Sequence, residues 1–482
     1  MTATRWLATL ALLVGCAGPE AQPQTFGEPL PAGSPLLPAR VRRLSNAELS
    51  RSFAALTGDA TGLVGLVPDL RQQGFTRNAA QVVDPLQADA IHDHAQRLAA
   101  EIAARAPELG PTFLHDLAYV AFRRPPKTDE LSRLQALFDS GGVELVTATV
   151  LEAPSSLYAS ELGGAEVRPG VVALTGHEIA TELAYLISGG PPDQALLTAA
   201  AGDALNSADE REAQARRLLA QDETRLQLRG FVREWLGIDG LNAQAKSSEL
   251  FPDFDERRPA MLAETDALID QVMTDGGATV AALLDAGLLQ QQSFLAAHSH
   301  DKTTSPVKRG VVVLERVLCR VVPRPGEVGI EVVPPPPDPT LSTRQLLQAH
   351  VSDSTCQSCH ETIDGVEVFE GVTDAVDGLA FENFDAVGAV RELDNGQPVD
   401  TSGQIALDDG DHTFADSWEL TALLGQSEEV RRCYARQALR FASATGDPTI
   451  EVAFAASVTE TSLIELLIAF VRNELFVLRR LP

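Results

Sequence analysis

The sequence is poor in positive charge, in aromatic side chains and in strand-like alternation. Lysine and arginine number 38 against 67 aspartates and glutamates, so the 482-residue chain has a formal net charge of −29. A chain this acidic repels phosphate backbones, which argues against a nucleic-acid partner. Its 44% hydrophobic and 22% charged residues are typical of a soluble globular protein, not of a disordered chain or a multi-spanning membrane protein.

Long apolar runs are also missing after the first 16 residues. The most apolar later stretch, residues 462–478, is interrupted by Glu465, Arg472, Asn473 and Glu474. A membrane span needs about 20 consecutive apolar residues, so we expect a docked helix in this stretch instead.

The N-terminus is typical of an exported lipoprotein. Residues 1–15 carry one positive charge, Arg5, and an apolar run too short to span a bilayer, which predicts a signal peptide. Leu13-Val14-Gly15-Cys16 resembles the bacterial lipobox, so we expect cleavage before Cys16 and lipid attachment to its sulfur. Ala17 in the next position fits sorting to the outer membrane or cell surface, facing the periplasm or the exterior. The alternative is an ordinary signal peptide with an incidental cysteine.

Capping signals and apolar periodicity predict a mainly α protein. Ser45–Glu48, Thr175–Glu178 and Ser342–Gln345 have the spacing of a capping box. Further amphipathic runs lie at 86–106, 111–122, 128–139, 143–152, 208–236, 256–286 and 305–319. Strand-like alternation gathers around 387–406, which predicts a few short strands in the C-terminal part.

The pentapeptide Cys356-Gln357-Ser358-Cys359-His360 is the one specific chemical signature in the chain. Two thiols three residues apart can bind the two vinyl groups of one haem, and the adjacent histidine can ligate its iron. We therefore predict one haem c, held by Cys356 and Cys359, with His360 as the iron ligand. The alternatives are a Cys356–Cys359 disulfide, or a zinc site that takes a further ligand from Cys319, Cys433 or a histidine.

Cys319 and Cys433 are the two other cysteines of the mature chain. In an oxidising compartment, two otherwise unpaired thiols favour a structural disulfide, which here would join residues 311–319 to a helix around 432–441. The alternative is two separately buried thiols.

The sequence does not single out one residue as the sixth iron ligand. Methionine is a common choice, but no methionine follows His360, and Met261 and Met273 lie far upstream. His350 or His412 could fill the position instead, or the iron could be five-coordinate and open to peroxide or oxygen chemistry.

Several weaker motifs occur in order along the chain: Arg43–Glu48, Ala121–Pro125, Ala153–Tyr158 with Glu161, Thr304–Gly310 with Cys319, Cys356–His360 and Gly378–Gly388. They resemble motifs of secreted cytochrome-like proteins of planctomycetes and myxobacteria, which are built from serial domains of unknown function. The resemblance implies a c-type cytochrome module on a helical body, and it implies no substrate. One departure is an extra stretch at about 365–377, where the haem edge should be covered.

These observations predict a helical-bundle body followed by a small c-type cytochrome-like module with a few short strands. The expected order is a signal peptide (1–15), a Pro/Gly-rich tether (16–40), two helical domains (41–165 and 166–300) and the haem module with C-terminal helices (301–482). A polyproline II connector is expected at 334–337.

The favoured function is single-electron transfer at the cell envelope, by an electron carrier rather than a catalyst. The acidic charge predicts a redox partner with a basic patch, and Cys16 predicts a membrane anchor. One alternative is a haem enzyme that acts on peroxide or an extracellular substrate. The other is a haem-free surface binding protein.

Overall fold

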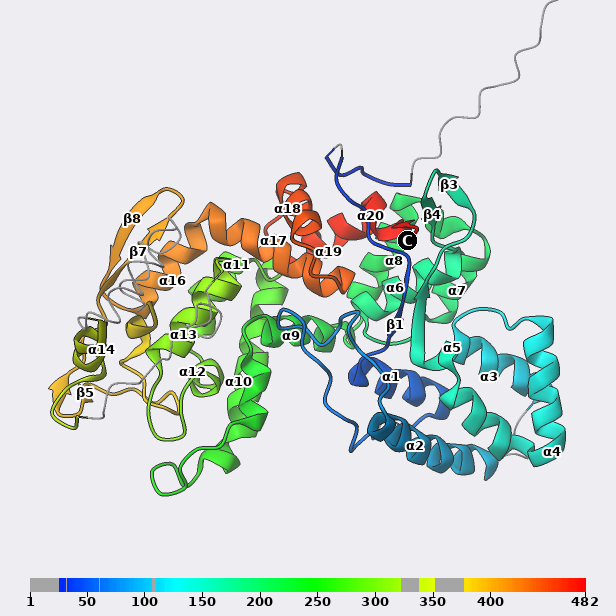
Figure 1. The fold of residues 1–482 in the computed structure, drawn as a ribbon, viewed down its shortest axis with the longest axis horizontal. Coiled ribbons are helices and arrows are strands. Elements are labelled where there is room, and N and C mark those ends of the chain that lie inside the picture. Colours follow the sequence, from blue (N-terminus) through cyan, green and yellow to red (C-terminus); the bar gives the residue numbers. More distant parts are fainter. Residues whose placement is uncertain (1–25, 32, 60, 106–109, 322–337, 352–376) are drawn as a thin grey trace, which may run out of the picture.

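The protein is mainly α-helical, as the sequence predicts (Figure 1). The structure is a computed structural model that describes residues 26–31, 33–59, 61–105, 110–321, 338–351 and 377–482. The signal peptide, Cys16, the proline run 334–337 and the pentapeptide 356–360 lie outside the described residues.

The N-terminal part is a group of helices beside a two-stranded sheet. Its elements are β1 (Arg40–Arg43), α1 (Asn46–Thr57), α2 (Pro85–Ala103), α3 (Phe113–Phe122), α4 (Thr128–Glu152), α5 (Pro154–Leu157) and β2 (Tyr158–Glu161). The capping box predicted before α1 is present: Ser45 Oγ accepts from Glu48 N, and Glu48 Oε2 accepts from Ser45 N. The two runs predicted at 128–139 and 143–152 form the single helix α4, which is kinked at Gly142, where φ is 66°.

The middle part is built from helices joined by short 3₁₀ turns. Its elements are β3 (Glu166–Arg168), β4 (Val171–Ala173), α6 (Gly176–Ile187), α7 (Gln194–Ala201), η2 (Ala204–Asn206), α8 (Ala208–Leu219), α9 (Thr224–Trp235), η3 (Ile238–Ala243), α10 (Phe254–Gly276), α11 (Val280–Asp285), η4 (Leu288–Gln290) and α12 (Gln292–Ala297). The predicted capping box of Thr175 and Glu178 opens α6.

The C-terminal part combines helices with two short hairpins. Its elements are α13 (Pro306–Val312), the π turn η5 (Val313–Val317), α14 (Thr343–Val351), η6 (Asp377–Phe381), β5 (Leu393–Asp394), β6 (Gln397–Pro398), β7 (Gly403–Leu407), β8 (Gly410–Phe414), α16 (Ser417–Gln426), α17 (Glu428–Ser443), α18 (Pro448–Ser457), α19 (Leu463–Arg472), α20 (Glu474–Val477) and β9 (Leu478–Arg480). Strands β5, β6 and most of β7 lie in the region 387–406 where short strands were predicted, whereas β8 and β9 follow it and β1–β4 were not predicted.

The sheets tie distant parts of the chain together. β1 pairs antiparallel with β2, β5 with β6 and β7 with β8, and β4 lies between β3 and the C-terminal strand β9. Figure 1 shows α14 and β5–β8 at one end of the long axis and α3 and α4 at the other. The long helix α17 lies between them.

The largest apolar core runs from Leu30 to Leu478 and takes residues from the N-terminal segment, the middle part and the C-terminal helices. Although aromatic residues are only 5% of the chain, five of them meet in this core: Phe75, Phe231, Trp235, Tyr434 and Phe441. Burying this much apolar surface is the dominant favourable contribution to folding. Elements far apart in sequence therefore depend on one another.

Residues 26–31 and 33–40, which were predicted to belong to a tether, pack on the body instead. Leu30, Leu36 and Leu37 are buried in the main core. Arg480 N donates to Leu37 O at 2.8 Å, and Glu474 N donates to Glu28 O at 2.9 Å. The frequent prolines prevent a helix here, but an irregular segment can still bury its leucines against elements contributed by the C-terminus.

The C-terminal stretch 462–478 forms α19, α20 and the start of β9, packed on the core as predicted. In the described ranges, no helix is long and apolar enough to cross a membrane.

A buried ionic cluster lies where β1, α1, α6 and the 70s loop meet. Glu48 accepts from Arg42 Nη1 at 2.7 Å and from Arg77 Nε at 3.3 Å, and Arg77 Nη2 donates to Glu182 Oε2 at 2.6 Å. Arg77 also donates to Phe441 O and Ala442 O near the end of α17. The cluster thus links the N-terminal helices to the C-terminal part.

Candidate functional site

The predicted haem ligands Cys356, Cys359 and His360 lie outside the described residues, but the chain on either side of them is described. Helix α14 ends at Val351, and η6 begins at Asp377. The contacts that hold these two elements form the frame of the candidate site.

Glu382, just after η6, is the centre of this frame. The side chain is almost completely buried and accepts hydrogen bonds from Arg391 Nη2 at 2.6 Å, Thr304 Oγ1 at 2.7 Å and Arg309 Nη1 at 3.4 Å. Arg309, which is fully buried on α13, also donates to Phe381 O at 2.9 Å. Burial lowers the pKa of Arg309 to about 10, so its guanidinium is still charged at neutral pH. Phe381 and Glu382 are therefore fixed to α13.

Helix α14, which leads into the pentapeptide, is fixed through its N-terminus. Thr343 N donates to Asp394 Oδ2 at 2.5 Å, which places a carboxylate at the positive end of the helix dipole. Ser342 and Gln345 form the predicted capping box: Gln345 N donates to Ser342 Oγ, and Ser342 N donates to Gln345 Oε1. Arg344 Nη2 adds a bond to Ser402 O.

Arg391 joins the two halves of the frame. Its Nη2 donates to Glu382 at 2.6 Å, and its Nη1 donates to Asp394 Oδ1 at 2.9 Å. One guanidinium thus binds the carboxylate behind the pentapeptide and the carboxylate that holds α14 in front of it. Charge-assisted bonds of this kind are stronger than neutral ones, so the same side chain holds the residues after η6 and, through Asp394, the N-terminus of α14.

The motif Gly378–Gly388 has a clear structural meaning. A Cβ on Gly378 would lie 1.8 Å from Pro306 O, so only glycine allows η6 to approach α13 this closely. Phe381 is fully buried, and Asp385 Oδ1 accepts from Val387 N and Ala389 N in a tight turn. These residues support the frame, and none of them reacts.

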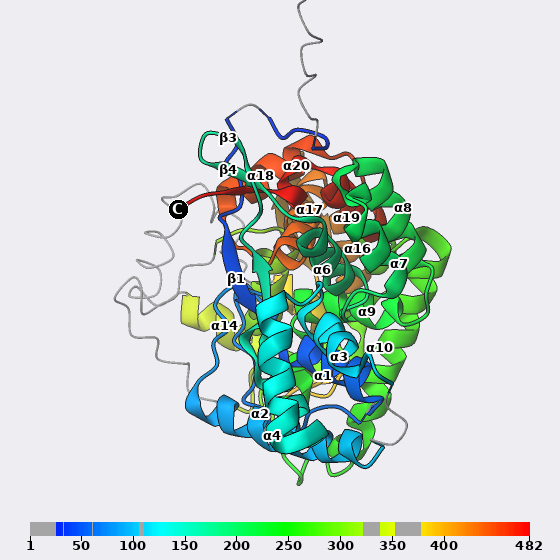
Figure 2. The same ribbon diagram turned by 90° about the vertical axis from the view of Figure 1, so that its right-hand side faces the viewer.

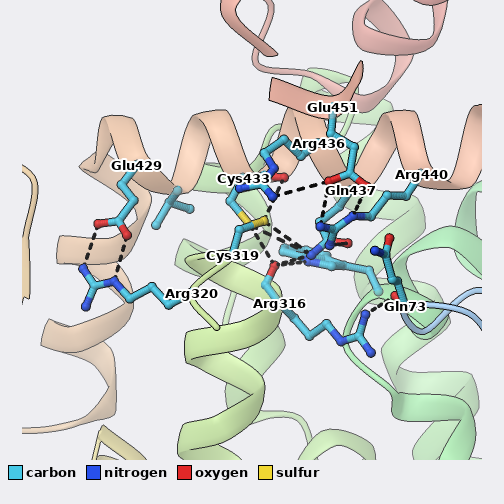
Figure 3. Close-up of a disulfide and its surroundings, with 12 residues drawn as sticks. Gln73, Arg316, Cys319, Arg320, Glu429, Cys433, Arg436, Gln437, Arg440 and Glu451 are labelled. Carbon is cyan, nitrogen blue, oxygen red and sulfur yellow. Dashed lines mark hydrogen bonds and ion pairs between the residues drawn. A yellow bond between two sulfur atoms is a disulfide. The ribbon is translucent and has the colours of Figure 1, made fainter. Parts of the chain in front are cut away.

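The Cys319–Cys433 disulfide is present, as predicted (Figure 3). It joins the chain after η5 to α17, with an S–S distance of 2.05 Å and a Cα–Cα distance of 5.4 Å. Beside it, Arg320 makes two 2.8 Å bonds to the carboxylate of Glu429 on the same helix. The alternative of two free buried thiols is therefore wrong.

The disulfide also bears on the zinc alternative. Cys319 and Cys433 were two of its candidate ligands, and a disulfide sulfur is not a thiolate ligand. Within the described ranges, no three His, Cys, Asp or Glu side chains gather as a metal site.

The candidates for the sixth iron ligand lie on three elements, α10, α14 and β8. Met261 and Met273 are buried on α10, where they pack in two different apolar clusters. His412 on β8 bonds Asp409 Oδ1 at 2.8 Å, and His350 lies on α14 with its side chain outside the described part.

Sequence reasoning missed the residues that build the frame: Arg309, Arg391 and Asp394. Arg309 and Glu382 lie within motifs already singled out, but charged residues are normally expected at the surface. The sequence feature that could have indicated a buried carboxylate is Glu382, which stands among the apolar residues of Leu379–Phe384.

Comparison with known proteins gives three family matches. Residues 42–104 match PSD3, a protein of unknown function (DUF1587), residues 174–299 match PSD4, a protein of unknown function (DUF1592), and residues 285–394 match PSCyt3, a protein of unknown function (DUF1588). No curated protein and no solved structure matches the chain. The PSCyt3 match contains the pentapeptide and the whole frame of Arg309, Glu382, Arg391 and Asp394. In their order along the chain, the three matches fit a multidomain family.

Proposed function

We propose that the protein is a lipid-anchored c-type cytochrome-like protein of the cell envelope that carries one haem and passes single electrons. Cys356 and Cys359 hold the porphyrin by thioether bonds, and His360 ligates the iron. The observation that carries the proposal is the Cys-x-x-Cys-His pentapeptide inside the PSCyt3 match, a name that denotes a cytochrome-like domain.

The donor chemistry fits a haem better than the other candidates. The disulfide uses Cys319 and Cys433, and the proposed lipid uses Cys16. Cys356 and Cys359 are therefore the two cysteines left to bind a haem. A haem c requires two thiols and one imidazole in this order, and the pentapeptide supplies all three.

The haem would supply an iron centre that changes oxidation state by one electron. The contribution of the chain is to fix the elements on either side of the binding segment. Arg391 bonds Glu382 after η6 and Asp394 at the N-terminus of α14, and Arg309 attaches Phe381 to α13. A rigid attachment limits how far the surroundings of a cofactor move when its charge changes, which suits an electron carrier.

The partners follow from charge and from Cys16. An acidic surface favours a redox partner with a basic patch, in an association that weakens as salt rises. The lipid on Cys16 holds the protein at the outer membrane or cell surface.

The test is expression of the full precursor with the cytochrome c maturation machinery. We expect a red protein that stains for haem after denaturing electrophoresis and shows a narrow α band when reduced. Cys356→Ser with Cys359→Ser should remove the stain, whereas the matched control Cys319→Ser with Cys433→Ser should keep it. A colourless wild-type protein of apoprotein mass would refute the proposal.

A second measurement separates carrier from enzyme. Carbon monoxide or cyanide should leave the spectrum of a six-coordinate carrier unchanged. A shifted spectrum would report an open iron position and favour the haem enzyme instead.

A further inference from the structure

The described chain begins at one particular face of the body. Arg211, which is fully buried on α8, donates from Nη2 to Phe26 O at 2.8 Å and from Nε to Val471 O at 2.8 Å. The next residue, Gly27, has φ of 143°, and a Cβ there would lie 2.1 Å from Arg472 O. Phe26 and Gly27 are therefore fixed against the end of α19.

The chain between this point and Cys16 is short. Ten residue steps separate Cys16 from Phe26, and a fully extended chain covers at most about 33–36 Å in ten steps. A compact body of this length has a radius of gyration of about 23 Å, so it is roughly 60 Å across. A lipid on Cys16 therefore holds Phe26 within about 36 Å of the membrane, which excludes orientations in which the side of the body opposite Phe26 faces the lipid.

This face carries exposed apolar and basic side chains. We use the name exposed face for the part of this surface that is formed by β3, β4, β9 and the residues that flank them. Leu162 is 52% exposed, Val167 38% and Leu481 38%, and they are joined by the β3–β4–β9 sheet and by the bond from Leu481 N to Gly170 O. Arg168 and Arg480 are exposed on the same strands, together with Glu166, and Arg168 Nη2 lies 3.9 Å from Glu474 Oε2. Figure 2 shows β3, β4 and α20 at the same edge as the N-terminal segment.

We propose that the exposed face rests on the lipid surface into which the acyl chains of Cys16 insert. This inference rests on the proposed lipidation of Cys16. Valine and leucine side chains at this face enter the headgroup region, and the arginine side chains reach the lipid phosphates. The end of the long axis that carries α14 and β5–β8 is then left open to the aqueous phase (Figure 1).

The experiment uses the acylated, haem-loaded protein reconstituted into vesicles of phosphatidylethanolamine and phosphatidylglycerol. Val167→Trp on the exposed face is compared with Leu393→Trp on β5, a position that is also exposed, at 58%. Vesicles with brominated acyl chains quench indole fluorescence only when the ring enters the bilayer. Trp235 and Trp418 emit beside the added indole, so we expect Val167→Trp to lose up to about one third of its emission and Leu393→Trp to show no change, relative to unbrominated vesicles.

Hydrogen exchange gives a second readout without any substitution. Amides of residues 162–171 should exchange more slowly on vesicles than in the Cys16→Ser protein in solution, and those of β5–β8 should not change. Acylated protein that floats with vesicles but shows neither effect would overturn the orientation alone. A mature protein whose mass contains no acyl chains would overturn the lipid anchor and the orientation together, while its haem stain would still test the haem proposal.

Discussion

Replacement of Glu48 by glutamine should lower the free energy of unfolding by far more than a change in a helix cap would. Glutamine keeps the shape of the side chain and can still accept from Ser45 N, so the capping box survives. What is lost is the negative charge between Arg42 and Arg77, which are 0% and 3% exposed. Glu182 is then left to compensate both guanidinium groups.

The magnitude follows from burial. An uncompensated buried charge costs about 3–5 kcal/mol. The matched control is Glu130→Gln. Glu130 is the third residue after the N-cap of α4, as Glu48 is in α1, and it accepts from Lys127 N and Arg124, but its side chain is 22% exposed. Because water screens that pair, we expect a loss of at most about 1 kcal/mol there.

The assay is urea unfolding at pH 7, followed by circular dichroism and by the fluorescence of the buried Trp235. Burial alone would raise the pKa of Glu48, but Arg42 and Arg77 hold it below the usual range. The contribution of Glu48 is therefore present at neutral pH and is lost as the pH falls below about 4.5, where the unfolded chain binds protons first. Equal losses in Glu48→Gln and Glu130→Gln at pH 7 would refute the reasoning.

Three further predictions follow from other features. The double variant Cys319→Ser with Cys433→Ser should lose about 2–5 kcal/mol in urea unfolding, because the bond closes a long loop, and an unchanged midpoint would contradict this. Burial raises the pKa of Glu234 to about 7, so the native state holds a proton that the unfolded chain has lost above about 4.5. The free energy of unfolding should therefore fall by about 3 kcal/mol between pH 4.5 and 7. In the Glu234→Gln variant, this pH-dependent fall should be absent. Electron exchange with a basic soluble cytochrome, measured by stopped flow, should slow as the ionic strength rises from 0.01 to 0.15 M, because the Debye length shrinks from about 30 to about 8 Å. A rate that does not change with ionic strength would contradict an acidic docking surface.

Local signals in the sequence predicted the helices well. Ser45–Glu48, Thr175–Glu178 and Ser342–Gln345 each open a helix, because a capping box is satisfied by residues only three positions apart. The disulfide was predicted by the count of cysteines in an exported chain, and the structure contains it.

Contacts between distant residues could not be predicted in this way. Leu37 is buried because β9, more than 400 residues later, lies beside it, and nothing in the composition of residues 26–40 indicates that partner. Arg391 looks like a surface arginine until the fold brings Glu382 and Asp394 to its two nitrogens. For the site itself, sequence supplied the reactive residues of the pentapeptide, and structure supplied the frame that holds the chain on both sides.

The pairing of Leu37 and Ala39 with Arg480 has a consequence for biogenesis. Leu37 and Ala39 need Arg480 to complete their packing, so this part of the fold cannot close before β9 has been synthesised. Under the proposed lipidation and haem attachment, both modifications would be able to act before this closure. Deleting the final strand should therefore yield a modified but protease-sensitive product, rather than an unmodified one.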